Sequence, residues 1–367
     1  MKHIPVLHPR LPSADRLAPY LQQIDANRVY SNFGPLNMEF GRRLGEHFGI
    51  EAGRVICAGT GTAALVAGIL AVAGRAEPGR HVALLPAFTF VGTALAAELC
   101  GYQVRFCDVD PDRWQLTPDL ARAALEQDGS IGLAVPVAPF GRPVRQAPWA
   151  EFQANTGLPV VIDAAAAFET VAANPDAFLG DLPVALSFHA TKSFATGEGG
   201  CVFVAGPSQA RLAIQALNFG FYTSRECDSF SFNGKLSEYH AAVGLAELDG
   251  WRDKSADFGR VVTLYRREFR DRGLERMLCC APETCSSYVL ACFDTVTEAN
   301  SVKKSLADAD IGFRHWYGKA LHRQNYYRGR DGPELPVSES LAERIIGLPM
   351  AQDLEPAAVH RVVQAVA

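Results

Sequence analysis

Between residue 35 and about residue 220 the chain alternates between two hydrophobic periods, and this alternation constrains the fold more than any other feature of the sequence. Apolar residues recur at helical spacing in GPLNMEFGRRLGEHFG, GTAALVAGILAVAG and DLARAALEQ. Between them lie short, continuous apolar runs: HVALLPAF, QVRFCDV, IGLAVPV, LPVVID, LPVALSF and GGCVFVAG. Strands that are apolar on both faces and alternate with helices are typical of a mostly parallel, covered sheet. The sequence therefore predicts an α/β domain.

The pattern of helix and strand signals in the sequence changes after Gly250. A long helical pattern over residues 237–270 leads into the segment SSYVLACF and then into further helix and strand signals. These patterns predict a large α/β domain over residues 1–250 and a small α+β domain over residues 251–367, both of ordinary size for domains. Because no flexible linker separates them, we expect the two domains to pack firmly and to leave a ligand-binding cleft between them.

Charge and composition exclude several classes of partner. There are 35 Lys and Arg residues against 40 Asp and Glu, the formal net charge is -5, and no basic run is longer than a pair. A nucleic-acid binder or a polybasic membrane anchor would need a concentrated basic patch. Prolines and charges interrupt the N-terminal segment, and no stretch of about 18 apolar residues occurs. We therefore expect a cytoplasmic protein without a nucleic-acid or membrane partner.

The nine cysteines favour reduced thiols. Their number is odd, most lie in apolar stretches, and none has the paired CxxC spacing of a zinc site. A free cysteine behaves as a small buried hydrophobic residue. We therefore expect structural thiols, with no disulfide framework and no bound metal.

Polar residues that follow apolar runs are the first candidates for a ligand site, because ligands of an open parallel sheet collect beyond the carboxyl ends of its strands. In ICAGTGTAAL, the residues Thr60, Gly61 and Thr62 lead directly into a helical pattern. Small residues and free N–H groups at a helix start favour binding of an anion such as phosphate. The alternative is an ordinary glycine turn with a threonine N-cap.

A carboxylate and a lysine occupy two further places of this kind. Asp163 ends the run LPVVID, where it either caps the helical pattern that follows or holds a proton on a cofactor heteroatom. Lys192, in HATKSFATGEGG, is the one lysine of seven that lies between two apolar strands. Burial lowers the pKa of a lysine and suits it to imine formation with an aldehyde. The alternative is an ion pair between Lys192 and Glu198.

Together, the helix start, the carboxylate and the lysine match the three anchors of pyridoxal phosphate (PLP): its phosphate, its pyridine nitrogen and its aldehyde. The sequence also resembles the DegT-type sugar aminotransferases, a family of fold-type-I PLP enzymes. The resemblance runs through YSNFGPLNMEFGRRL, PAFTFVGTALAAELCGYQVRFCDVD, IDAAAAF, SFHATKSFATGEGG, FNGKLSEYHAAVGLAEL and LPMAQDLEPAAVHRVV, and so covers nearly the whole chain. It implies a large PLP-binding domain with a mostly parallel sheet covered by helices and a smaller C-terminal α+β domain.

The resemblance also implies roles for individual residues. Lys192 corresponds to the imine-forming lysine and proton carrier, and Asp163 to the partner of the pyridine nitrogen. Phe90 corresponds to an aromatic residue stacked on the cofactor ring, with a core phenylalanine as the alternative. The implied phosphate contacts are Gly61, Thr62, Ser187 and, from a neighbouring subunit, Asn233, so that a homodimer shares its active sites. Implied substrate residues are His189, Lys235, Tyr317 and His322, where His189 has a hydrogen-bonded core histidine as its alternative.

Two departures from the family pattern concern the substrate. Ala166 stands where many relatives have Gln, and RHWYGKALHRQ lacks the proline of the corresponding family segment. Related sugar dehydratases carry histidine in place of the lysine, so the presence of Lys192 favours amino transfer. The resemblance implies a PLP-dependent aminotransferase that moves an amino group from glutamate to the keto carbon, expected at C4, of a nucleotide-linked 4-keto-6-deoxyhexose. The alternatives are an aminotransferase for another keto substrate, such as a cyclitol, and a non-catalytic sensor that retains the fold.

Overall fold

The computed structural model describes residues 3–279, 287–330 and 332–367. Its strands are β1 (Val55–Ala58), β2 (Val82–Pro86), β3 (Gln103–Cys107), β4 (Ile131–Ala134), β5 (Ile162–Asp163), β6 (Val184–Ser187), β7 (Gly200–Phe203), β8 (Val289–Cys292) and β9 (Ile345–Leu348). Its α-helices are α1 (Ala14–Asn27), α2 (Pro35–Phe48), α3 (Gly61–Val72), α4 (Val91–Leu99), α5 (Pro118–Gln127), α6 (Gln146–Thr156), α7 (Phe168–Ala173), α8 (Pro175–Phe178), α9 (Pro207–Leu217), α10 (Glu238–Arg270), α11 (Val296–Asp308), α12 (Pro336–Arg344) and α13 (Pro356–Val366).

The large part of the molecule is built on two adjoining sheets. Their strands run in the orders β1-β7-β6-β5 and β3-β2-β4. Isolated parallel bridges from Ala134 to Val160 and from Val137 to Asp163 join the two sheets. All strand pairs of this part are parallel except those of β7, which runs antiparallel to β1 and to β6. The predicted mostly parallel sheet is confirmed, and each of the six predicted apolar runs contains a strand.

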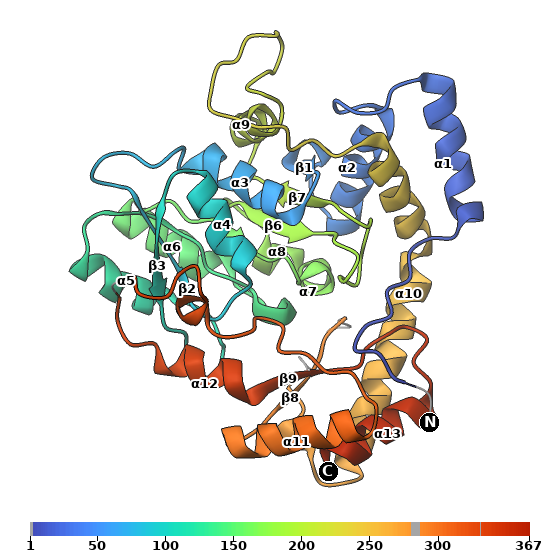
Figure 1. The fold of residues 1–367 in the computed structure, drawn as a ribbon. Helices are drawn as coiled ribbons and strands as arrows, with labels where there is room; N and C mark the ends of the chain where they lie inside the picture. Colours follow the sequence, from blue (N-terminus) through green and yellow to red (C-terminus); the bar gives the residue numbers. More distant parts are fainter. Residues whose placement is uncertain (1–2, 280–286, 331) are drawn as a thin grey trace.

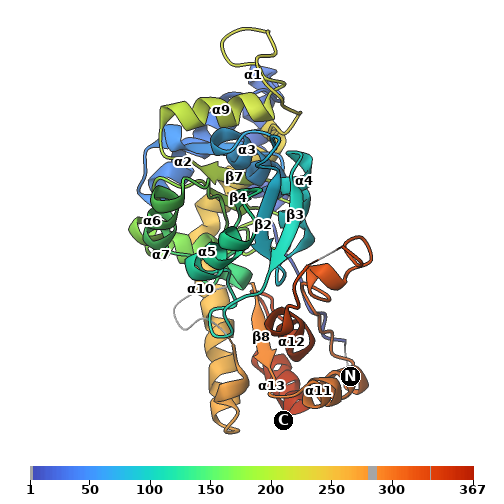
Figure 2. The ribbon, with the colours of Figure 1, turned by 90° about the vertical axis from the view of Figure 1, so that its left-hand side faces the viewer.

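Helices cover both faces of these sheets, as Figures 1 and 2 show. Successive residues of a strand point to opposite faces. In β6, Val184 and Leu186 enter a core that also contains residues of α2, α6 and α10, whereas Ala185 enters a second core with residues of α3, α4 and α9. Burial on both faces explains why these strands have continuous apolar sequences.

The helix α10 connects the large part of the molecule to a small part (Figure 1). Its first half contributes Leu245 to a core of the large part, and its second half contributes Tyr265 to a third core with β8, β9, α11 and α13. The expected boundary between residues 250 and 251 falls inside this helix, and the division into two domains stays a prediction. Near the chain start, Ile4 bridges to Ile311 and belongs to the third core.

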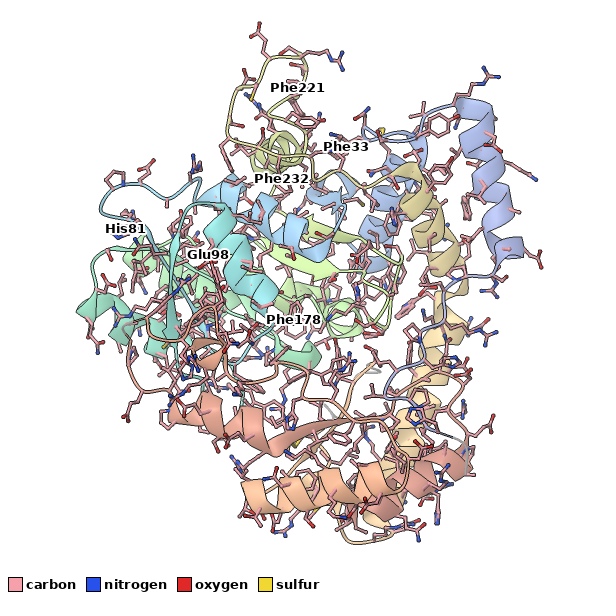
Figure 3. All side chains as sticks on the ribbon, in the orientation of Figure 1. Phe33, His81, Glu98, Phe178, Phe221 and Phe232 are labelled. Carbon is pink, nitrogen blue, oxygen red and sulfur yellow. A yellow bond between two sulfur atoms is a disulfide. The ribbon has the colours of Figure 1, made fainter. Side chains whose placement is uncertain are left out.

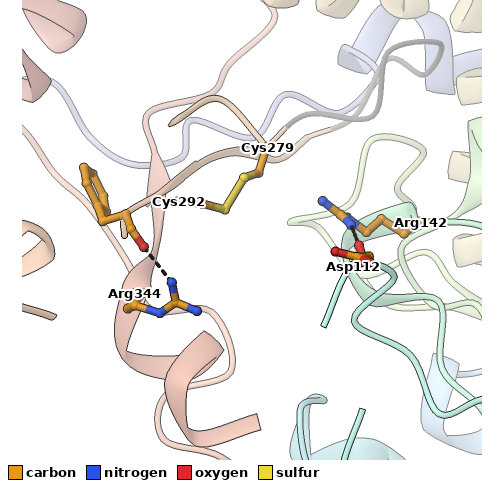
Figure 4. The surroundings of a disulfide bond; sticks show 6 residues. Asp112, Arg142, Cys279, Cys292 and Arg344 are labelled. Carbon is orange, nitrogen blue, oxygen red and sulfur yellow. Dashed lines mark hydrogen bonds between the residues drawn. A yellow bond between two sulfur atoms is a disulfide. The ribbon is translucent and has the colours of Figure 1, made fainter. Parts of the chain in front are cut away.

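The expectation of reduced thiols is wrong for two cysteines. Cys279 and Cys292 form a disulfide bond (Figure 4). Leu278 and Ala291 form an antiparallel bridge beside it, so the pairing of backbone segments brings the two cysteines together. Spacing along the sequence did not reveal this contact. The free cysteines of the described residues are Cys57, Cys100, Cys107, Cys201 and Cys227, and Cys280 and Cys285 lie outside the described residues.

The described helices include none that combines the length and the apolar character required to cross a membrane. The described side chains also include no group of three or more His, Cys, Asp or Glu residues placed to hold a metal ion.

Candidate active site

A cavity of about 540 Å³ lies beside the ends of β5 and β6, between the large and the small parts of the molecule. Its lining includes eight of the eleven residues predicted to bind cofactor or substrate, namely Gly61, Thr62, Phe90, Asp163, Ser187, His189, Lys192 and Tyr317. The first seven come from the large part, and Tyr317 comes from the small part. The predicted cleft between the two parts is therefore present, and most of the predicted site residues meet in it.

The start of α3 forms one wall of this cavity. Thr60 is the N-cap residue, and its Oγ1 accepts a hydrogen bond from the N–H of Ala63 at 3.0 Å, so the threonine cap is present. The N–H groups of Gly61 and Thr62 belong to the first turn, where a helix provides no acceptor of its own. A Cβ on Gly61 would lie 2.5 Å from the Cβ of Ser187, so glycine is needed for this close approach to β6. Free N–H groups and the helix dipole suit this wall to a phosphate group.

Asp163 lies buried at the end of β5 and borders the cavity. Its Oδ2 accepts a hydrogen bond from Thr93 Oγ1 at 2.7 Å, and its Oδ1 accepts one from the N–H of Ala165 at 3.0 Å. Burial raises the pKa of Asp163, although both hydrogen bonds and the charge of Lys192 oppose the shift. The carboxylate is thus held in a dry position, where a cationic partner would stabilise its charged form.

Lys192 lies in the turn between β6 and β7 and extends its amine into the cavity. Its backbone N–H donates to the carbonyl oxygen of His189 at 2.8 Å, and its Nζ donates to the hydroxyl oxygen of Tyr288 at 2.8 Å. The alternative of an ion pair with Glu198 is wrong for the described chain. The carboxylate of Glu198 instead lies 3.7 Å from Nε2 of His189.

The structure also decides two alternatives for neighbouring residues. Phe90 is 61% exposed at the start of α4, so it is not a core phenylalanine. The His189 side chain is 46% exposed, and its Nδ1 lies 2.8 Å from Thr191 Oγ1, so it is not a buried histidine. Both side chains are available to a ligand in the cavity.

Tyr317 lies on the opposite wall, against the large part of the molecule. Its hydroxyl oxygen accepts a hydrogen bond from the N–H of Phe140 at 3.2 Å, and the two rings stack with centroids 4.3 Å apart. Burial raises the pKa of Tyr317 well above its ordinary value. Its hydroxyl is therefore neutral and serves as a fixed polar group on this wall.

Three of the predicted residues are not among those that line the cavity of the described chain. Asn233 is exposed in the segment between α9 and α10. In the same segment, the Nζ of Lys235 lies 4.2 Å from the ring centroid of Phe219, and burial lowers the pKa of Lys235. The Nε2 of His322 lies 2.8 Å from Oε1 of Glu339.

The cavity contains further polar and aromatic residues that the sequence analysis did not single out. Thr93 holds the carboxylate of Asp163, and Tyr288 contacts the amine of Lys192. Arg314 and Trp316 line the small-part wall, with the guanidinium carbon 5.1 Å from the ring centroid of Trp316. The sequence around Tyr288 and Thr93 did not indicate a role in the site, because each residue contacts a site residue more than 60 positions away along the chain.

Comparison with known proteins gives the family. The model of the DegT/DnrJ/EryC1/StrS aminotransferase family matches residues 13–367. The chain belongs to this family. The resemblance seen in the sequence is therefore confirmed over nearly the whole chain.

Three relatives illustrate what this DegT-family chain is similar to. Protein Rv3402c of Mycobacterium tuberculosis H37Rv is 34% identical over 371 residues, which cover 99% of this chain and 89% of the relative. A dTDP-4-amino-4,6-dideoxy-D-glucose transaminase of Shigella dysenteriae is 30% identical over 249 residues, covering 68% of this chain and 65% of the relative. A Bacillus cereus crystal structure described as a PLP-dependent aminotransferase matches with a TM-score of 0.87 and 27% identity over 100% of both chains. The fold is that of the PLP-dependent aminotransferases.

The cofactor of this DegT-family protein is PLP, and the residues of the cavity fit it. The start of α3 provides N–H groups for a phosphate, and the glycine at position 61 leaves the room that a side chain would take. Asp163 is a buried carboxylate that a protonated ring nitrogen would stabilise. Lys192 brings an amine to the same cavity, and Phe90 offers an exposed aromatic ring.

Proposed function

We propose that this protein transfers an amino group from glutamate to the keto carbon, at C4, of a nucleotide-linked 4-keto-6-deoxyhexose. The observation that carries the proposal is the convergence of Lys192, Asp163 and the start of α3 on one cavity. The family match supports aminotransferase chemistry. The name of the Shigella relative, a transaminase of a dTDP-4-amino-4,6-dideoxy sugar, supports a nucleotide-linked deoxyhexose and position C4.

In this proposal the start of α3 and the end of β6 bind the cofactor phosphate through Gly61, Thr62 and Ser187. These residues would hold the phosphate end of the cofactor, and the exposed ring of Phe90 would contact the cofactor ring. When bound, PLP supplies an aldehyde that condenses with amines and a ring that withdraws electrons from the reacting carbon. The rigid helix start keeps the reacting carbon at a constant place relative to Lys192.

Asp163 holds a proton on the pyridine nitrogen. Its two hydrogen-bond donors, Thr93 and Ala165, fix the orientation of the carboxylate and favour its charged form. Because the carboxylate is buried, water does not screen its interaction with a positive ring. The ring is then kept in the protonated form that withdraws electrons best.

Lys192 is both the attachment point of the cofactor and the proton carrier. With PLP bound, its amine would take a proton from the α-carbon of the amino donor and deliver it to C4′ of the cofactor. The second half of the reaction repeats these steps in reverse on the keto-sugar. A single amine near both carbons can perform both transfers, and Lys192 is the one lysine among the residues that line the cavity of the described chain.

The sugar binds on the side of the cavity that faces the small part. His189 and Tyr317 line the cavity and would provide polar groups for the sugar. Ala166 also lines the cavity and has no amide to offer the substrate, in contrast to the Gln of many relatives. Lys235 and His322 complete the substrate site in the assembled protein.

The protein acts as a homodimer whose active sites are shared. The segment between α9 and α10 extends beyond the body of the molecule (Figures 1 and 2), and Figure 3 shows Phe221 in its outer loop and Phe232 closer to the body. It exposes large apolar side chains, a feature of interaction surfaces: Phe219 (45% exposed), Tyr222 (49%) and Phe230 (46%). Asn233 at the base of this segment reaches the phosphate bound by the neighbouring subunit. We place this homodimer in the cytoplasm.

The proposal is tested by incubating protein loaded with the pyridoxamine form of the cofactor with a panel of keto compounds. The panel contains nucleotide-linked 4-keto- and 3-keto-hexoses with different bases, and keto-cyclitols. Mass spectrometry of the products should show amination of a 4-keto-6-deoxyhexose, together with return of the yellow aldehyde form. Amination of cyclitols alone would contradict the proposed substrate. Tight cofactor binding without amination of any compound, and without a reaction with glutamate, would contradict catalysis and favour a sensor.

A further inference from the structure

The hydroxyl group of Tyr288 lies within hydrogen-bonding distance of the amine of Lys192. Nζ of Lys192 donates to the tyrosine oxygen at 2.8 Å, and Nζ lies 5.3 Å from the centroid of the ring. The two residues are 96 positions apart in the sequence and come from the two parts of the molecule. The small part thus contacts the reactive amine directly, and not only the substrate side of the cavity.

Packing on both sides fixes the position of this hydroxyl. Tyr288 is 8% exposed. Its ring meets Phe140 of the large part at 5.6 Å and Trp316 of the small part at 5.1 Å, both edge to face. The next residue, Val289, begins β8 and pairs with Leu348 of β9. A tyrosine held in this way presents its oxygen at a constant place.

Lys192 needs such a partner whenever it is not bonded to the cofactor. A lysine amine stands on a flexible four-carbon stem, and ordering it costs side-chain entropy. Tyr317 lies on the same wall, but its oxygen accepts from the N–H of Phe140. Among the described residues, Tyr288 is the one whose side chain accepts a hydrogen bond from Lys192.

We propose that Tyr288 is a positioning residue that holds the released amine of Lys192 in the cavity, ready to carry a proton. This inference rests on the proposed role of Lys192. It adds that the small part of the molecule contributes to amino transfer through the lysine, in addition to lining the substrate side.

The first test measures the amine itself, without turnover. Full-length protein freed of cofactor is labelled with trace acetic anhydride over a range of pH, and peptide mass spectrometry follows Lys192, with the exposed Lys319 as internal reference. The hydrogen bond to the tyrosine oxygen holds the amine in one position and must break before the amine can react with the reagent. The Tyr288→Phe variant should therefore label faster at Lys192, by roughly tenfold.

Tyr317→Phe is the matched control for this measurement. It removes a second buried hydroxyl from the same wall, but one that does not contact Lys192. Labelling of Lys192 should then follow the wild-type curve. An unchanged curve in Tyr288→Phe, or an equal change in both variants, would overturn the proposal.

The second test uses the holoenzyme. Tyr288→Phe keeps the packed ring, so its melting temperature and its affinity for PLP should match the wild type. In a single half-reaction with glutamate, followed by absorbance, its rate constant should fall roughly tenfold while the glutamate concentration for half-saturation is unchanged. A wild-type rate constant, or a loss that follows a fall in melting temperature, would overturn the positioning role. Attachment of the cofactor to another lysine would instead overturn the proposed function of Lys192, so the two failures are distinguishable.

Discussion

Replacement of Asp163 by asparagine separates an electronic role of this residue from a structural one. Asparagine has the same shape and keeps an oxygen that can accept from the N–H of Ala165. Its amide group can donate to the hydroxyl of Thr93, which has Thr89 Oγ1 at 2.9 Å as a second partner. The substitution therefore removes the negative charge and disturbs the local hydrogen bonds little.

The two roles lead to expected effects of very different size. Retained hydrogen bonds limit the change in the free energy of unfolding to about 1 kcal/mol. A carboxylate in contact with a positive ring nitrogen raises the pKa of that nitrogen by about 1–3 units, and each unit is about 1.4 kcal/mol or a tenfold change in population. We therefore expect Asp163→Asn to lower turnover roughly 10- to 1,000-fold while the melting temperature stays nearly constant.

The assay combines turnover, a pH titration of the absorbance of bound cofactor, and a melting curve. Thr93→Val is the matched control, because it removes one donor and leaves the charge. Its turnover should fall less near neutral pH. Since loss of a hydrogen bond to the charged form raises the pKa of Asp163, its activity should be lost at a higher pH on acidification. Nearly full turnover of Asp163→Asn, or its unfolding, would refute the electronic role.

Three further predictions follow from particular contacts. Gly61→Ala should weaken cofactor binding, measured by titration of absorbance, because the added Cβ would lie too close to Ser187. The control variant Gly53→Ala should bind the cofactor normally, because its Cβ meets nothing within 4 Å. Equal cofactor affinities of the two variants would contradict binding of the phosphate at the start of α3. Burial raises the pKa of Glu169 from 4.5 to about 7, so this carboxyl lowers the free energy of unfolding as pH rises from 4.5 to 7. Glu169→Gln should therefore stabilise the protein against urea by up to about 3 kcal/mol above pH 7 and little at pH 4.5, and a pH-independent effect would contradict the shift. Mixing inactive Lys192→Ala with inactive Asn233→Asp protein should restore activity, because one site of each mixed dimer carries neither change; no recovery after verified subunit exchange would place Asn233 outside the neighbouring site.

The sequence was sufficient to predict the parallel strands, and most of the residues that it singled out line one cavity. The strands are buried on both faces, so their apolar runs are continuous and easy to recognise. Asp163 was recognisable because it ends such a run, and Lys192 because it lies between two of them. By contrast, the antiparallel direction of β7 depends on how the turn from β6 is packed. Hydrophobic periodicity does not indicate in which direction a strand runs.

Contacts between segments that lie far apart along the chain could not be predicted from the sequence. Tyr288 lies close to Lys192 because β8 pairs with β9 and the small part packs against the large one. The disulfide of Cys279 and Cys292 depends on the same kind of pairing, and an odd cysteine count argued against it. The helix α1, which contains Pro19, had no predicted counterpart, because a proline inside a helix weakens the helical signal.

Chemical trapping of the cofactor tests the central claim most directly. Borohydride reduction of the holoenzyme, followed by proteolysis and mass spectrometry, converts the bond between cofactor and protein into a stable mark on one lysine. We predict the phosphopyridoxyl mass on the peptide that contains Lys192, with no mark in Lys192→Ala protein that still binds the cofactor through the start of α3 and Asp163. A mark on any of the other six lysines would contradict the account.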